Sequence, residues 1–191
     1  MMTKTANRSA TIVLVLGAAL LATPAIAQQR ATASPGEQPG GQPPTIQTSL
    51  ANDVGTLAEK FTGLARVMAG KYEWRPGPGV RSVAEVFNLI VMENRMLAGL
   101  LTGAGSPEGG GGGNQVTDPA AMQEALRTSY AALKQALSGL SDSDLKANVK
   151  IFGRETTKQG AALMLIFDQH EHLGQSIAYA RTNSIVPPWS K

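Results

Sequence analysis

One helix-compatible run contains both histidines of the chain: Ile166-Phe-Asp-Gln-His-Glu-His-Leu-Gly-Gln-Ser-Ile-Ala-Tyr-Ala-Arg181. Histidine ionises near neutral pH and is a common metal ligand, so any acid–base or metal chemistry is expected in this run. Side chains two residues apart on a helix point about 200° away from each other. His170 and His172 therefore cannot share one face, and only one of them can point into the interior.

The N-terminal part of the chain resembles an export signal. Residues 1–27 combine Lys4 and Arg8, an apolar run over residues 11–22 and the small residues Ala25 and Ala27, which is the pattern of a cleaved secretory signal peptide. Residues 28–44 are rich in Gln, Pro and Gly and are predicted to be a disordered leader. We therefore expect a secreted or periplasmic protein with one folded domain over residues 45–191, and no stable membrane span after signal cleavage.

Composition narrows the function classes. The chain has no cysteine, which excludes a disulfide framework and catalysis by a thiol. Its formal charge of +3 falls to +1 once Lys4 and Arg8 are removed with the signal. No basic stripe with interleaved aromatic residues is present, so nucleic acid is not an expected partner.

Four long segments carry apolar residues at the spacing of amphipathic helices, over residues 45–68, 82–101, 118–137 and 157–182. Ser82-Val-Ala-Glu85 fits a capping box, and Asp118-Pro-Ala fits a capping residue followed by proline in the first turn. Thr156 or Thr157 can cap the last helix. With no convincing paired strands, the sequence predicts an all-α four-helix bundle.

The connections differ in character. Lys71–Val80 contains prolines and glycines and is predicted to be an ordered loop or lid that uses Tyr72 and Trp74 to cover one end of the bundle. Residues 109–113 are all glycine and are interpreted as a flexible linker, because a phosphate loop would need a Lys-Ser/Thr ending. A short helix is expected over residues 141–145, followed by a brief extended segment at 149–152.

Three motifs carry a family resemblance: Trp74-Arg-Pro-Gly-Pro-Gly-Val-Arg-Ser-Val-Ala-Glu-Val-Phe87, His170-Glu-His-Leu-Gly-Gln175 and Ile177-Ala-Tyr-Ala-Arg-Thr-Asn-Ser-Ile-Val-Pro-Pro-Trp189. Together they resemble the exported branch of the DinB-like superfamily. The resemblance implies a four-helix bundle, often a homodimer. It also implies a divalent metal held by three histidines, one from the second helix and two at i and i+4 on the fourth.

Two of the three ligand positions implied by the resemblance have changed. The second-helix histidine falls on Asn88 and the first fourth-helix histidine on Asp168, whereas His172 is retained. The implied metal set is therefore Asn88, Asp168 and His172, with zinc, nickel or manganese as candidate ions. An amide oxygen is a weak ligand for transition metals, so an altered or weakly held ion is expected.

Metal-free interpretations stay open. Asp168 and His172, one turn apart, can form a polar pair with Gln175 inside the bundle, or act as a general base on water. Apolar periodicity alone favours His170 as the interior histidine, because Ile166, Leu173 and Ile177 share its face, whereas the resemblance favours His172. Glu93 and Arg95 are assigned to a solvated or inter-helix polar face.

Three functional hypotheses follow. The first is a pocket protein that binds an unidentified small molecule or a weakly held divalent ion. The second is a metal-dependent hydrolase or transferase, in which the ion activates water. The third is a structural protein of the envelope that self-associates through the bundle surface. The sequence alone does not decide whether the protein is an enzyme.

Overall fold

The computed structural model describes residues 43–105 and 115–190. The predicted signal peptide, the leader up to residue 42 and the predicted glycine linker lie outside the described residues, so these assignments stay predictions. The elements, in chain order, are α1 Ile46–Val67, a short 3-10 helix at Ala69–Lys71, α2 Val83–Thr102, α3 Pro119–Ser138, α4 Asp142–Leu145, β1 Asn148–Ile151, β2 Arg154–Thr157 and α5 Lys158–Thr182.

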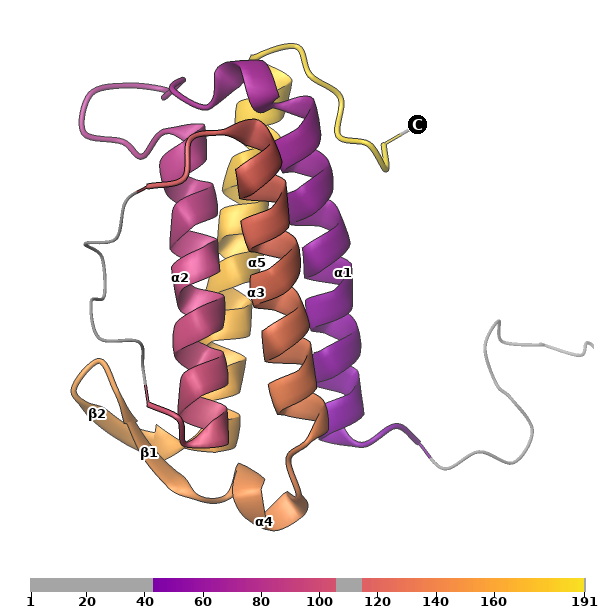
Figure 1. The fold of residues 1–191 in the computed structure, drawn as a ribbon, viewed down its shortest axis with the longest axis vertical. Helices are drawn as coiled ribbons and strands as arrows, with labels where there is room; N and C mark the ends of the chain where they lie inside the picture. Colours follow the sequence, from indigo (N-terminus) through magenta and orange to yellow (C-terminus); the bar gives the residue numbers. More distant parts are fainter. Residues whose placement is uncertain (1–42, 106–114, 191) are drawn as a thin grey trace, which may run out of the picture. The chain divides into compact units, whose positions relative to one another are not determined.

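The four long helices lie side by side along the length of the domain (Figure 1). Helix α1 packs on α3, α3 on α2, α2 on α5, and α5 returns to α1, which closes the bundle. The all-α four-helix bundle predicted from the sequence is thereby confirmed. No helix among the described residues is long and apolar enough to cross a membrane.

The predicted helix starts are also confirmed. Thr45 accepts a hydrogen bond from the amide of Thr48, and Ser82 and Glu85 form the complete capping box. Asp118 caps α3 in front of Pro119, and Thr157 rather than Thr156 caps α5. These side chains satisfy amide groups that have no partner within the first turn of a helix, which fixes where each helix begins.

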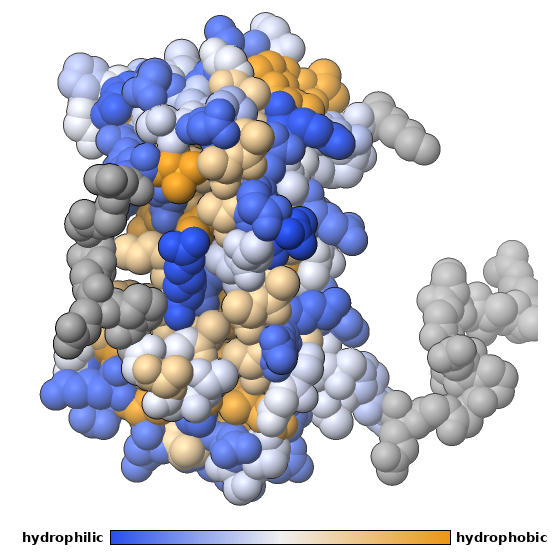
Figure 2. All heavy atoms as spheres, viewed as in Figure 1, coloured by the Kyte–Doolittle hydropathy of each residue, from blue (hydrophilic) through white to orange (hydrophobic). Residues whose placement is uncertain are grey.

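Aromatic rings from three helices pack against one another in the core. Phe61 of α1 packs edge-on against Phe87 of α2 and stacks on Tyr130 of α3, with ring centroids 6.3 and 6.2 Å apart. All three rings are buried. On the outside, hydrophilic residues interrupt the apolar ones over the face of the domain seen in Figure 2.

The loop before α2 is ordered, as predicted. The Tyr72 hydroxyl donates to the carbonyl of Ala65 at 2.9 Å, and the carbonyls of Tyr72 and Trp74 accept from the first amides of α2. Trp74 packs edge-on against Tyr179 of α5 with ring centroids 5.2 Å apart. The loop therefore holds the start of α2 against α5.

The expectation of no paired strands is wrong for residues 148–157. Strands β1 and β2 form an antiparallel hairpin in which Ile151 pairs with Arg154. The turn residues Phe152 and Gly153 both have positive φ, as a two-residue hairpin turn of type I′ requires. Phenylalanine rarely adopts that conformation, and β2 is wholly polar, so neither usual hairpin signal is present in the sequence.

Candidate metal centre

Three side chains meet between α2 and α5: Glu93, Asp168 and His172. Each offers one ligand atom, and the three atoms lie within 4.8 Å of one another. Asp168 and His172 come from successive turns of α5, and Glu93 comes from the facing helix α2. Helical periodicity places residues four apart on one face, which is why the α5 pair converges.

Glu93 is the most unusual member of this group. Its side chain is only 5 % exposed, and its Oε2 atom has no hydrogen-bond partner among the described residues. Burial, which is the largest cause, a hydrogen bond with Asp168 and the negative charge of Asp168 together raise the pKa of Glu93 to about 8, against the opposing charge of Arg81. A buried carboxyl of this kind is stabilised by a bound proton or a bound cation.

A chain of hydrogen bonds fixes the tautomer of His172. The Tyr179 hydroxyl donates to the carbonyl of Arg81 at 3.1 Å, so it must accept from the amide group of Gln175, whose Nε2 lies 2.8 Å away. The Gln175 Oε1 atom then faces Nδ1 of His172 at 2.9 Å, and this contact requires a hydrogen on Nδ1. In neutral His172 the lone pair is therefore on Nε2.

The free nitrogen of His172 points at the rest of the group. Its Nε2 lies 3.5 Å from Oδ2 of Asp168. A lone pair and a carboxylate oxygen repel each other unless a proton or a metal ion lies between them. Metal-binding histidines in proteins are commonly held in this way, with the second ring nitrogen donating to a fixed acceptor.

The two histidines have different surroundings. The His172 side chain is 17 % exposed, whereas the His170 side chain is 43 % exposed and its Nε2 lies 2.8 Å from Oδ2 of Asp53 on α1. His170 therefore makes an inter-helix contact at the surface. The orientation suggested by apolar periodicity is wrong, and the one implied by the family resemblance is correct.

Asn88, predicted as the third ligand, makes other contacts. Its Nδ2 donates to the carbonyls of Ala84 and Val116, and its Oδ1 accepts from the amide of Val116, each at 2.9 Å. Both amide atoms thus tie α2 to the segment before α3. The metal set of Asn88, Asp168 and His172 stays a prediction. In the structure Glu93 lies together with Asp168 and His172, whereas Asn88 is hydrogen-bonded to the backbone of Val116.

Glu93 had a signal in the sequence. Val86, Ile90 and Leu97 form a buried stripe on α2, and Glu93 lies on that stripe, three residues after Ile90 and four before Leu97. A carboxylate on an apolar stripe is rarely buried without a proton, a partner or a metal. Of the two environments assigned to Glu93 from the sequence, the inter-helix one is correct and the solvated one is wrong.

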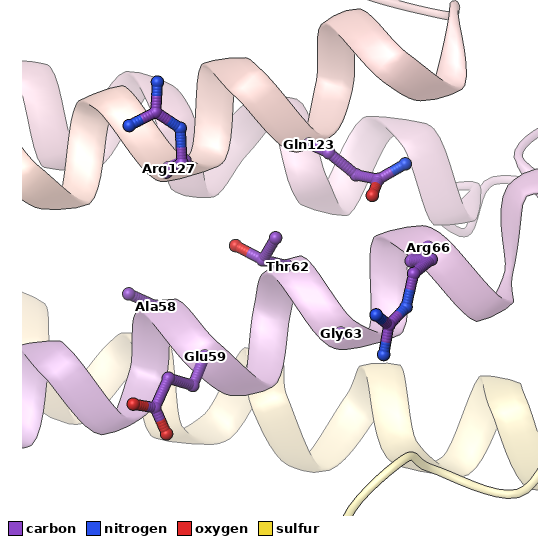
Figure 3. Close-up of a pocket in the computed structure, with 7 residues that line it drawn as sticks. All are labelled: Ala58, Glu59, Thr62, Gly63, Arg66, Gln123 and Arg127. Atoms are coloured by element: carbon purple, nitrogen blue, oxygen red, sulfur yellow. The ribbon is translucent and has the colours of Figure 1, made fainter.

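A separate groove of about 370 Å³ runs between α1 and α3. It is lined by Ala58, Glu59, Thr62, Gly63, Arg66, Gln123 and Arg127 (Figure 3). Arg127 forms an ion pair with Glu124, and the Arg66 and Arg127 side chains point away from each other in Figure 3. Because its polar groups do not converge, this groove is a weaker candidate than the group between α2 and α5.

Comparisons with known proteins agree with the geometry of the bundle. A family model described as the DinB superfamily matches residues 19–176. A crystal structure of a DinB-like protein from Bacillus cereus superposes with a TM-score of 0.62 at 20 % identity, covering 74 % of this chain and 95 % of that one. A DinB-like protein from Bacillus subtilis gives a TM-score of 0.58 at 15 % identity, covering 71 % and 92 %. A comparison with curated proteins gave no match.

Proposed function

The chain belongs to the DinB superfamily, and we propose that its bundle binds a divalent metal ion between α2 and α5 through Glu93, Asp168 and His172. The observation that carries this proposal is the buried Glu93 carboxyl. Its Oε2 has no hydrogen-bond partner within residues 43–105 and 115–190, and it belongs to a group with a carboxylate and an imidazole whose ligand atoms lie within 4.8 Å of one another. These are three metal-ligating residue types, and together they would neutralise a dication with two negative charges.

The ligand types indicate which ion is preferred. Two carboxylates and one imidazole form an oxygen-rich set, which suits Mn²⁺ and is accepted by Zn²⁺, whereas Ni²⁺ generally favours more nitrogen. The set differs from three histidines because two of its members carry charge. We therefore expect manganese or zinc in preference to nickel.

The chemistry supported by this set is hydrolytic. A metal ion with three protein ligands keeps positions for water and substrate, and it lowers the pKa of a bound water. The chain's own contribution is to direct the Nδ1 hydrogen of His172 at Gln175, which Tyr179 orients, so that the lone pair of the neutral ring is on Nε2, and to keep Glu93 out of bulk water. Metal-dependent hydrolysis is therefore the reaction class we propose for the site, in an exported protein.

Two histidine variants give a matched test. Elemental analysis of the purified chain, without a metal-binding tag, is expected to find manganese or zinc near one ion per chain. His172→Ala is expected to lose the ion, and His170→Ala is expected to keep it, because His170 contacts Asp53 outside the group. A wild-type protein that takes up neither ion on dialysis against millimolar Mn²⁺ or Zn²⁺ would contradict the proposed function.

A further inference from the structure

A hydrogen bond in the centre of the bundle joins the two helices that carry the metal ligands. Gln169 Nε2 of α5 donates to Asn94 Oδ1 of α2 at 2.8 Å, and both side chains are fully buried. Asn94 directly follows Glu93, and Gln169 directly follows Asp168. The buried amide pair and the Glu93–Asp168 pair therefore lie at the same level of the bundle, one behind the other.

A third helix fixes the direction of this amide pair. Asn94 Nδ2 lies 3.1 Å from the Ser129 hydroxyl of α3, and Ser129 donates its only hydroxyl hydrogen to the carbonyl of Leu126 at 3.0 Å. Ser129 can then only accept from Asn94, so the Asn94 amide group must face Ser129 and its oxygen must face Gln169. The orientation is thus determined from α3 through α2 to α5.

We infer that Asn94 and Gln169 are positioning residues for the metal centre, holding α2 and α5 at the level and separation at which Glu93 meets Asp168 and His172. This inference rests on the proposed metal site. Consecutive residues on a helix are related by a fixed rise of about 1.5 Å and a turn of about 100°. A bond between residues 94 and 169 therefore also limits how far residues 93 and 168 can move apart.

The pair is a poor choice if stability is its only role. Gln169 Oε1 is buried and has no hydrogen-bond partner among the described residues. A partly satisfied polar pair in a core generally contributes less to stability than apolar side chains of the same shape. Leucine has nearly the shape of asparagine, and methionine nearly that of glutamine. The double variant Asn94→Leu/Gln169→Met should therefore fold with unchanged or raised thermal stability.

The experiment compares metal affinity and stability in the same variants. We would titrate Mn²⁺ and Zn²⁺ into the wild-type chain, the double variant and the control Gln47→Met, and record the melting of each metal-free protein. Gln47 is a buried glutamine that donates to Asp142 at 2.9 Å, and its Oε1 also has no partner in the described part of the chain, but it joins α1 to α4. It therefore matches the chemistry of Gln169 away from the metal centre.

The expected result is a metal affinity weakened by about tenfold or more in the double variant, an effect comparable with losing a hydrogen-bond partner of a ligand, because the helices no longer hold the ligands at this separation. No loss of melting temperature is expected. Gln47→Met should bind metal with the affinity of the wild type.

Equal affinity in wild type and double variant would overturn the inference. If wild type binds no metal, the proposed function fails, and crystal structures of the metal-free proteins still test the inference. A double variant that keeps the three ligand atoms within 4.8 Å would overturn it.

Discussion

His172 directs its Nε2 atom at Oδ2 of Asp168, one turn earlier on α5, at 3.5 Å. The opposite ring nitrogen faces the side-chain oxygen of Gln175 at 2.9 Å. With Nδ1 occupied as a donor, the imidazole offers Asp168 either a proton or a lone pair. The pair is thus arranged to share a cation, and the same cation would be shared with the buried carboxyl of Glu93.

The hydrogen-bond chain behind His172 predicts an effect of Tyr179 on metal affinity. Tyr179→Phe removes the acceptor that orients Gln175, so the Gln175 amide can turn and His172 loses its fixed tautomer. We expect metal affinity to weaken by about tenfold, because outer partners of a ligating histidine usually have effects of this size. Competition titration against a chromogenic chelator measures it.

Tyr72→Phe is the control for that experiment. Its hydroxyl also donates to a backbone carbonyl, that of Ala65 at 2.9 Å, but no residue of the metal centre depends on it. It should cost about 1 kcal/mol of stability, as a lost hydrogen bond does, and leave metal affinity unchanged. Equal affinity losses in the two variants would show that Tyr179 acts only through general stability.

Stability of the metal-free protein is expected to fall as pH rises. The pKa of Glu93 is about 8 in the folded protein against 4.5 for the unconstrained side chain, so between these values the folded state binds a proton that the unfolded state has released. The stabilisation by the Glu93 proton is full below the lower pKa and is lost as pH rises through the higher pKa. The stability lost between these two pKa values is about 3–5 kcal/mol.

Chemical denaturation at pH 5, 7 and 9 measures this dependence. Glu93→Gln cannot ionise, so its stability curve should be flatter over the same range. Asp53→Asn offers a comparison, since it removes a carboxylate that is partly exposed and lies outside the metal centre. Identical slopes for wild type and Glu93→Gln would mean that Glu93 stays ionised in the folded protein.

Asn88 is expected to be a structural residue. Asn88→Ala removes two hydrogen bonds to Val116 and should lower stability by about 1–3 kcal/mol, because the Val116 backbone groups lose their partners. Metal content should not change. Elemental analysis together with thermal melting separates the two effects. Loss of the ion in a variant that still melts cooperatively would make Asn88 a ligand, as the family resemblance implied.

The sequence predicted the bundle because its signals are local. Ser82, Asp118 and Thr157 cap the helices in which they were found, and apolar residues three and four apart mark the buried stripes of α1, α2 and α3. The hairpin was missed because β2 is polar and its turn begins with a phenylalanine at positive φ. Ile151 of the hairpin is buried in the core of the bundle, a contact that local patterns do not report.

The site was harder to predict because polar residues occupy core positions. The buried face of α5 includes Gln169 and Ser176, so apolar residues alone place that face incorrectly and point to His170. The family resemblance corrected this for His172 and Asp168. It could not supply Glu93, which lies on the other helix and becomes a neighbour of Asp168 only after the bundle has formed.

Metal binding is expected to release a proton at neutral pH. Because the pKa of Glu93 is about 8 without metal, the ion must displace the Glu93 proton below that pH, and affinity should rise about tenfold per pH unit until it levels off near pH 8. Calorimetric titration in two buffers of different ionisation enthalpy counts the protons released. We expect close to one proton released per ion at pH 7 and close to none at pH 9.

The Glu93→Gln variant, with no proton to displace, should bind metal more weakly and without this pH dependence. A wild-type titration that releases no proton at pH 7 would show that metal binding does not displace a proton from Glu93.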